Sequence, residues 1–134
     1  MARSTITQSV IYSDFRTDFE LHPVSGDLGR LTDVEAVKRS IKNICFTGVY
    51  ERFWRPTFGA GLKKYLFEPV SYITESLIKK AIEDAIANYE PRANTYEVYV
   101  AALPDQNAYT ATIIFTVINT PEPIKFSLLL NRIK

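Results

Sequence analysis

The sequence has few of the residues that most often carry redox, metal or nucleophilic chemistry. Its 134 residues include one cysteine, Cys45, and one histidine, His22. A single thiol cannot form an intramolecular disulfide, and one cysteine cannot build a zinc finger or an iron–sulfur site. Cys45 stands between Ile44 and Phe46, so we expect it to pack as a small apolar side chain. We expect no metal and no cofactor.

The chain also lacks a dominant charge and a long hydrophobic run. Sixteen basic and 15 acidic residues give a net charge of +1, which provides no electrostatic footprint for nucleic acid or anionic lipid. No apolar run approaches the roughly 18 residues that cross a bilayer. Residues 1–5 lack the apolar centre of a secretion signal. We therefore expect no nucleic-acid partner, no membrane insertion, and folding in a cytoplasm.

Apolar residues are abundant enough for a globular core. The hydrophobic fraction is 46% and the aromatic fraction is 13%, which suits one domain of this length rather than a disordered chain. Residues 1–10 are polar and without pattern. We predict a flexible N-terminal arm over residues 1–10 and a single domain over residues 11–134.

Hydrophobic periodicity predicts two main helices. Thr32 and Glu35 fit a capping box, and the apolar stripe that follows predicts a helix ending near Phe46. A short helical turn is expected over residues 62–67. The longest helix should run from about residue 71 or 74 to residue 89 or 90, with Glu75 and Lys79 spaced for an ion pair.

Alternating patterns predict the strands. Residues 95–103 and 108–118 should form an antiparallel hairpin around a turn at 104–107. Residues 119–123 should break the pattern before a third strand over 124–130, and residues 11–21 read as an extended segment. The predicted fold class is α+β, with two main helices packed on a small, mostly antiparallel sheet. That sheet would comprise the C-terminal hairpin, the extra strand and the 11–21 segment.

The search for a catalytic constellation gives little. Neither a P-loop nor a dinucleotide-binding glycine motif is present, and His22 stands before a proline in a predicted loop. Asp14, Asp18 and Glu20 could in principle supply the two carboxyl groups of a glycosidase. However, the even-numbered residues of an extended segment share one solvated face, where acids keep ordinary pKa values. We predict no catalytic residues.

The end of the longest helix breaks a local rule. Pro91 should stop the helix at or near Glu90, which places an anion where the helix dipole favours cations. Such departures tend to mark functional or strained positions. Alternatively, Arg92 folds back, pairs with Glu90 and satisfies the last carbonyl groups. The residues themselves leave both interpretations open.

Two further segments need an explanation for their apolar side chains. The irregular loop before the longest helix carries Phe53, Trp54 and Phe58, which must be buried against the chain's own core or against a partner. The predicted strand over 124–130 has one charge and no proline, so a free edge there would be an aggregation hazard. It is either central in the chain's own sheet or completed by a partner strand.

Five blocks of residues resemble a known family. They are residues 39–43 (Arg-Ser-Ile-Lys-Asn), 51–52 (Glu-Arg), 55–59 (Arg-Pro-Thr-Phe-Gly), 66–68 (Leu-Phe-Glu) and 88–92 (Asn-Tyr-Glu-Pro-Arg). Their order resembles that of the gene-25-like baseplate wedge proteins of contractile phage tails. The same family includes baseplate subunits of type VI secretion systems and of tailocins. The resemblance extends over residues 11–134.

The resemblance implies a structural role as a sheath initiator. The implied partners are the larger baseplate wedge proteins, the tail sheath protein and, as a further alternative, hub or tube proteins. The implied location is a virion tail baseplate, or the cytoplasmic baseplate of a secretion system, assembled in the bacterial cytoplasm. The residues implied to dock on the wedge proteins are Glu90, Pro91, Arg92, Arg55 and Phe58. The resemblance implies that the β-region initiates the sheath, and the strand-like, weakly charged segment near the chain end is our candidate for that contact: Ile124, Lys125, Phe126, Ser127, Leu128, Leu129 and Leu130.

Two rival functions remain from other classes of protein. Some members of the family are labelled lysozymes, so one alternative is a tail-associated cell-wall glycosidase. The residues give that label no chemical support, because no acid–base pair meets the geometric requirement. The other alternative is a small soluble adaptor unrelated to tails. We expect a protein that is not an enzyme.

Overall fold

The computed structural model describes residues 13–15, 21, 23–24, 26, 30–117 and 120–133. The predicted N-terminal arm, His22, and the candidate acids Asp18 and Glu20 lie outside these residues. The elements follow in the order β1, β2, α1, α2, α3, β3, β4, β5, with a 3-10 turn over Pro104–Gln106 between β3 and β4. The predicted α+β class is confirmed.

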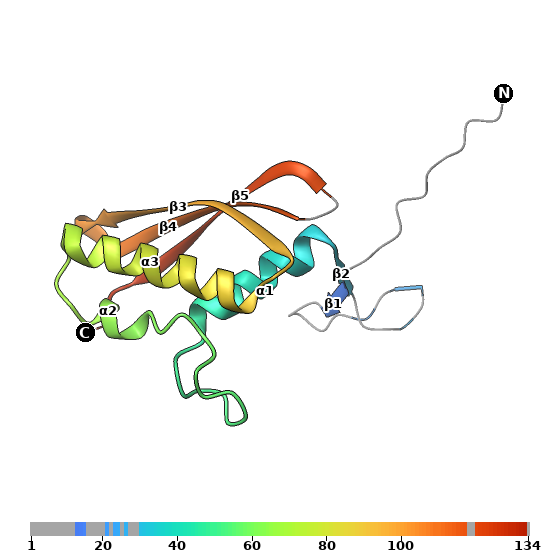
Figure 1. The fold of residues 1–134 in the computed structure, drawn as a ribbon, viewed down its shortest axis with the longest axis horizontal. Helices are drawn as coiled ribbons and strands as arrows, with labels where there is room; N and C mark the ends of the chain where they lie inside the picture. Colours follow the sequence, from blue (N-terminus) through green and yellow to red (C-terminus); the bar gives the residue numbers. More distant parts are fainter. Residues whose placement is uncertain are drawn as a thin grey trace.

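The main sheet has three antiparallel strands in the order β3-β4-β5. They span Ala93–Leu103, Ala108–Val117 and Thr120–Asn131. The two long helices lie along one side of this sheet (Figure 1). Register is fixed across all three strands, with Tyr99 opposite Thr112 and Thr112 opposite Ser127. The predicted hairpin is confirmed, and Asn107 closes it in a left-handed conformation, φ 52°.

The prediction that the 11–21 segment joins the main sheet is wrong for residues 13–15, the part of it that forms a described strand. Its strand β1, Ser13–Phe15, pairs instead with β2, Arg30–Thr32, in a separate antiparallel sheet of two strands. Strands close in sequence usually pair with one another. Within the described residues, β1 has β2 as its partner and the main sheet ends at β3 and β5.

Helix α1, Val34–Phe46, ends where the sequence predicts but begins differently. The residue before its first turn is Asp33, which has φ 47° and makes no capping hydrogen bond with its side chain. The predicted capping box at Thr32 is therefore wrong. The reason is that Thr32 is the last residue of β2, where its backbone pairs with Ser13. The predicted apolar stripe is buried, including Val37 and Ile41.

Helices α2, Lys63–Leu66, and α3, Tyr72–Tyr89, match the prediction. The side chain of Ser71 caps α3 by accepting a hydrogen bond from the amide of Thr74. Glu75 does not form the expected ion pair with Lys79. Its carboxylate instead accepts the backbone N–H of Ala102 on β3 at 2.8 Å, and Lys79 lies 4.0 Å from Glu83.

Strand β5 is longer than predicted and lies at an edge. It includes Pro121 and Pro123, so the predicted break over 119–123 is wrong for residues 120–123. An edge strand tolerates proline because part of its amide row has no neighbouring strand to bond. Since β4 is the central strand, the interpretation of residues 124–130 as a central strand is also wrong.

The core lies between the sheet and its two long helices. Cys45 is buried in it, as predicted, and this burial raises the pKa of its thiol to about 12. Such a thiol packs as an apolar side chain and is unreactive at neutral pH. The largest fully buried side chains come from both layers: Tyr109, Phe115, Ile41, Ile44, Ile78, Ile82, Ile86, Ile113 and Leu130.

Candidate functional site: an arginine groove and an open strand edge

Glu90 and Arg92 form an ion pair directly after α3. The Glu90 side chain is 1% exposed and the Arg92 side chain is 30% exposed. Arg92 donates two parallel hydrogen bonds, from Nε to Oε1 at 2.6 Å and from Nη2 to Oε2 at 2.8 Å. Bidentate pairing of this kind fixes both side chains. Of the two interpretations that the sequence left open, the pairing of Arg92 with Glu90 is therefore present.

Glu90 remains ionised despite its burial. Burial by itself raises the pKa of this carboxyl group, because a charged group loses its hydration. The hydrogen bonds from Arg92 and Ser40 and the positive charge of Arg92 outweigh that cost, and the net pKa lies below the ordinary value for glutamate. The carboxylate is thus an internal anchor, and its effect on the surface is to hold Arg92 in one place.

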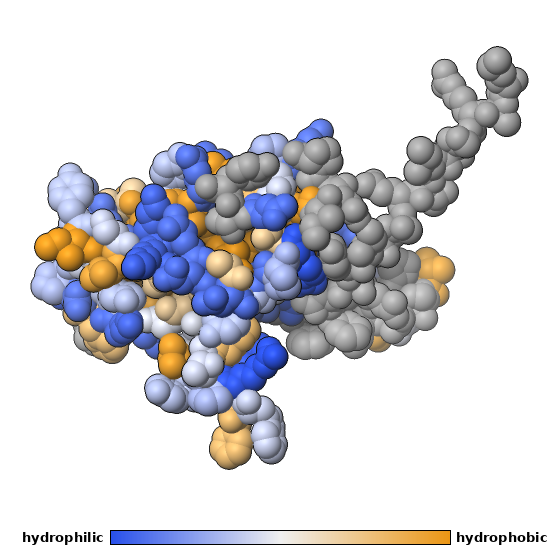
Figure 2. Space-filling view, viewed as in Figure 1, coloured by the Kyte–Doolittle hydropathy of each residue, from blue (hydrophilic) through white to orange (hydrophobic). Residues whose placement is uncertain are grey.

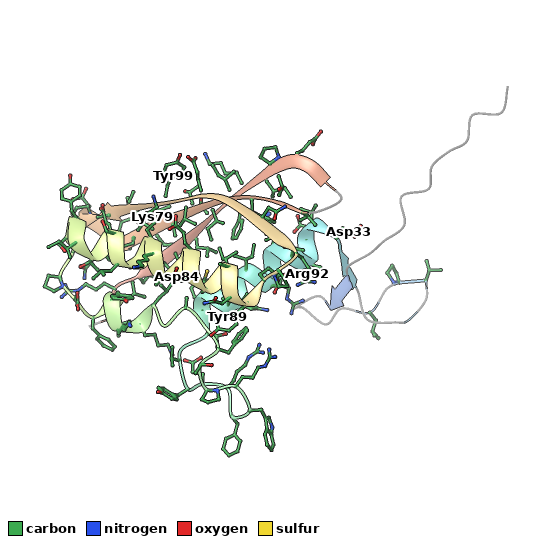
Figure 3. The ribbon with its side chains drawn as sticks, viewed as in Figure 1. Asp33, Lys79, Asp84, Tyr89, Arg92 and Tyr99 are labelled. Atoms are coloured by element: carbon green, nitrogen blue, oxygen red, sulfur yellow. The ribbon has the colours of Figure 1, made fainter. Side chains whose placement is uncertain are left out.

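Arg92 lines a groove shared by α1, the loop before α2, and the end of α3. The groove has a volume of about 420 Å³. Tyr89 and Arg92 lie together at the end of α3 that approaches α1 (Figure 3). The groove carries three guanidinium groups, and none of its lining residues is acidic. Its lining is Arg39, Ser40, Asn43, Ile44, Arg52, Phe58, Tyr89 and Arg92.

Four of the five blocks noticed in the sequence meet in this groove. Residues 39–43 supply its α1 wall, Arg52 and Phe58 come from the loop, and Tyr89 and Arg92 come from the end of α3. Arg39 and Arg92 are 53 positions apart in the sequence, so periodicity alone gives no sign of the convergence. The remaining block, residues 66–68, lies at the end of α2, where the Leu66 carbonyl accepts the Ile133 amide at 3.0 Å.

The loop between α1 and α2 is attached to the helices through Phe58. The Phe58 ring is 8% exposed and lies 4.8 Å from the Tyr89 ring, centroid to centroid. The Arg52 guanidinium lies over the Phe58 ring, 4.2 Å from its centroid, and the Tyr89 hydroxyl donates to the Thr57 carbonyl at 2.6 Å. Phe58 therefore forms the floor of the groove, whereas Arg55 is exposed and does not line it.

Gly59 allows the base of this loop to close. Its φ is +113°, and a Cβ added there would lie 2.3 Å from the Thr47 carbonyl oxygen. Only glycine adopts that geometry without strain or collision. The next residue, Ala60, donates its amide to the Ile44 carbonyl at 3.2 Å. The Phe-Gly end of the Arg-Pro-Thr-Phe-Gly block is thus explained by a buried ring followed by a close backbone approach.

The other aromatic residues of the loop point away from the core. Phe53 and Trp54 are 93% and 91% exposed, and their rings meet edge to face at 5.8 Å between centroids. The loop projects from the body of the molecule (Figures 1 and 2). The sequence left open whether the aromatic residues of this loop are buried in the chain's own core or against a partner. The answer is divided: Phe58 is buried, and Phe53 and Trp54 are not.

The second candidate site is the outer edge of β5. Among the described residues, no strand pairs with this edge, since β5 ends the sheet. From Ile124 to Asn131 the pairing with β4 is continuous. A register shift precedes this stretch, between Phe115 and Val117 of β4. Leu128 and Leu130 are buried, and Ser127 and Leu129 are exposed. The segment therefore keeps a regular row of main-chain groups at the border of the sheet.

The groove lacks the elements of an active site. Its lining contains no carboxylate, and the neighbouring Glu90 is buried in an ion pair, so a two-carboxylate hydrolytic site is not present there. In the part of the chain that the structure describes, no cluster of three or more histidine, cysteine or acidic residues could hold a metal ion. Within the same residues, no helix is long and apolar enough to span a membrane.

Solved structures share this fold. A crystal structure from Geobacter sulfurreducens, named as a proposed tail lysozyme, has a TM-score of 0.67 and 23% identity, covering 73% of this chain and 89% of that one. A chain of the anti-feeding prophage baseplate has a TM-score of 0.62 and 20% identity, covering 92% and 87%. A chain of the postcontracted pyocin R2 baseplate has a TM-score of 0.51 and 21% identity, covering 81% and 95%. The fold thus occurs in baseplates of phage-tail-like particles.

Sequence comparison gives the family. The family model for the baseplate wedge protein gp25 matches residues 32–122. The baseplate wedge protein gp25 of Enterobacteria phage T4 is 30% identical over 115 residues, which is 86% of each protein. The chain belongs to this family, which places it among the structural baseplate components of phage tails and related contractile systems. The resemblance noticed in the five blocks is confirmed.

Proposed function

We propose that this protein docks on the larger baseplate wedge proteins through the arginine groove and nucleates the tail sheath through the open edge of β5. The observation that carries the proposal is the convergence of four separated blocks on one groove that has no catalytic groups. Contacts with hub or tube proteins and assembly in the bacterial cytoplasm are extensions of the same proposal. The particle would be a virion tail or a secretion-system baseplate.

The groove suits docking because its charges are held in place. Arg92 is fixed by a buried carboxylate, and Arg52 is held over the Phe58 ring. Preorganised arginines lose little side-chain entropy when they bind, and their planar groups recognise carboxylates with two bonds. Pro91 is exposed beside them and stiffens the turn. Glu90 and Phe58 would position these groups, while Arg92, Arg52 and Arg55 would reach the partner.

A non-catalytic role fits the same geometry. Glycoside hydrolysis needs one carboxylic acid and one carboxylate on either side of the bond. The ionised Glu90 has no acidic neighbour in the groove and is closed off by Arg92. The alternative of a tail-associated glycosidase is supported by the name of the Geobacter relative and by no arrangement of the described side chains.

Neutralising groove arginines tests the docking site. The variant Arg39→Gln/Arg52→Gln should keep its fold yet bind the larger wedge proteins at least about tenfold more weakly, or ~1.4 kcal/mol, in a quantitative pull-down. Lys64→Gln/Lys80→Gln removes the same charge from exposed positions outside the groove and should bind normally. Equal binding by all three proteins would remove the groove from the proposal.

The β5 edge suits sheath nucleation because it offers main-chain hydrogen bonds. A partner strand that adds to an exposed edge gains affinity from the backbone and specificity from alternate side chains. Pro121 and Pro123 cannot donate such bonds, so the competent part of the edge is residues 124–131. This part includes residues 124–130, which the sequence pattern already selected as the candidate strand for the sheath contact.

Proline substitution at the edge tests this second contact. Ser127→Pro should block sheath assembly, whereas Ser127→Ala, which keeps the amide, should not, although it removes the contact between Ser127 Oγ and Thr112 Oγ1 at 3.1 Å. Assembly is measured by electron microscopy of tails formed with each variant, and the melting temperature of each free protein is measured in parallel. Normal sheaths on a folded Ser127→Pro baseplate would exclude β5.

A further inference from the structure

A second cavity lies between α1 and the open edge of β5. Its volume is about 390 Å³, and it is lined by Glu35, Lys38, Arg39, Lys42, Phe126, Ser127 and Leu128. The lining therefore combines three cations and one anion from α1 with three consecutive residues of the edge strand. It borders three residues of β5, the strand next to which a partner strand would run about 4.8 Å away.

The positive charge of this cavity has little internal compensation. Glu35 is the one acidic residue of the lining and lies 3.8 Å from Lys38, so three cations and one carboxylate leave the lining with a net charge of +2. Arg39, which also lines the arginine groove, has two buried nitrogens, Nε and Nη1, with no hydrogen-bond partner among the described residues. Buried donors without a partner cost free energy, and they gain most from an acceptor supplied by a ligand. The cavity therefore favours an anionic occupant.

From this geometry we infer that the segment that adds to β5 is an extended strand with acidic residues at alternate positions, on the face turned toward α1. The inference rests on the proposed strand addition and specifies the chemistry of its partner. Alternate residues of a strand share one face and are about 6.7 Å apart. Lys38 and Lys42 are one helical turn apart, a rise of about 6 Å. One face of the strand can thus present successive carboxylates to successive cations.

The apolar floor adds a second requirement for the partner strand. Phe126 is half-buried against Phe115, with ring centroids 5.8 Å apart, and Lys38 Nζ lies 6.0 Å from the Phe126 ring centroid. A carboxylate beside Lys38 would thus sit next to an aromatic surface that excludes water, where charge pairing is stronger than in bulk solvent. A basic strand would instead meet three like charges. The α1 wall is therefore the element that selects between partner strands.

A labelled peptide binding assay tests the inference. The probe is a peptide of about eight residues with glutamate at every second position and threonine between, and its control has lysine in place of each glutamate. Fluorescence anisotropy with the full chain at about 50 mM salt should show at least about tenfold tighter binding of the acidic peptide. Lys38→Gln/Lys42→Gln should abolish most of that preference, and Lys64→Gln/Lys80→Gln should retain it.

Nuclear magnetic resonance locates the bound peptide on the protein. It also distinguishes failure of this inference from failure of the proposed sheath contact. Amide shift changes over residues 124–131 and 38–42 support the inference, whereas changes confined to the residues around Arg52 and Arg92 overturn it. Absence of binding up to millimolar peptide, or equal binding of both peptides, also overturns it. In either case the proposed sheath contact stands or falls separately, on the assembly phenotype of Ser127→Pro.

Discussion

The two proposed contact regions are made of different parts of the chain. The arginine groove consists of side chains: three guanidinium groups on a floor of Phe58 and Tyr89, with Arg92 held by a carboxylate that is 1% exposed. The β5 edge consists of main chain, and its exposed side chains are ordinary, such as Ser127 and Leu129. A groove of the first kind depends on residue identity, whereas an edge of the second kind depends on backbone geometry and on the absence of proline.

The opposite edge of the sheet sharpens this contrast. Strand β3 carries a register irregularity between Thr95 and Glu97, and its Ala102 amide is taken up by Glu75 of α3. Bulges and covered amides are common means of closing an edge to strand addition. Each edge strand has one register shift in its pairing with β4, and the two edges differ in that the Ala102 amide on β3 is already bonded to Glu75 of α3. This difference supports β5 as the side for a partner strand.

The largest single-residue effect is expected in the groove. Arg92→Ala should lower the free energy of unfolding by about 3–5 kcal/mol, because it leaves Glu90 charged and buried without its main partner. Chemical denaturation of the isolated protein measures this value. Arg55→Ala, which changes an exposed arginine outside the groove, is the matched control and should stay within about 0.5 kcal/mol.

A double variant makes the cause of that loss explicit. Glu90→Gln/Arg92→Ala removes the buried charge together with its partner, so part of the stability lost in Arg92→Ala should return. A loss below about 1 kcal/mol in Arg92→Ala would mean that the pair behaves like an ordinary surface ion pair. The groove would then not be preorganised in the sense proposed here.

The dependence of stability on pH should come next in size. The folded pKa of Glu90 is lowered, whereas in the unfolded chain it is close to about 4.3. The unfolded state therefore binds more protons as the pH falls through this region. The contribution of Glu90 is fully present above the unfolded pKa and is lost as the pH falls through the lower folded pKa. Denaturation series between neutral pH and about pH 3 should be flatter for Glu90→Gln, and parallel curves would contradict the assignment.

The two regions also differ in how far the sequence predicts them. The groove could be anticipated in part, because charged and aromatic residues in an unusual local setting, such as Glu90 before Pro91, stand out in a sequence. Their convergence with residues 39–43 could not, since it depends on how α1 and α3 pack together. Phe58 shows the same limit: its sequence position indicated importance, but only the packing shows that it lies 4.8 Å from Tyr89 and forms a floor.

Main-chain features were harder to predict, for a physical reason. The helix ends and the hairpin followed from periodicity and turn residues. The capping box at Thr32 failed because pairing with Ser13 in a strand competes for the same backbone. The position of residues 124–131 at an edge could not be deduced, because an apolar strand with one charge suits either a central or an edge position. The pattern of leucine and β-branched residues indicates which face of the strand is buried. Whether the strand lies at an edge depends on which strands pair with it.

The smallest effect is expected from a side-chain change on the open edge. Leu129→Thr replaces a half-exposed leucine on β5 with a residue of good strand propensity and leaves every backbone group in place. The free energy of unfolding should change by no more than about 0.5 kcal/mol, and sheath assembly should continue, because strand addition depends mainly on main-chain hydrogen bonds. Denaturation of the free protein and electron microscopy of assembled tails measure the two quantities. A folded Leu129→Thr protein that fails to nucleate sheath would show that the partner reads this side chain, and the contrast between a side-chain groove and a main-chain edge would have to be abandoned.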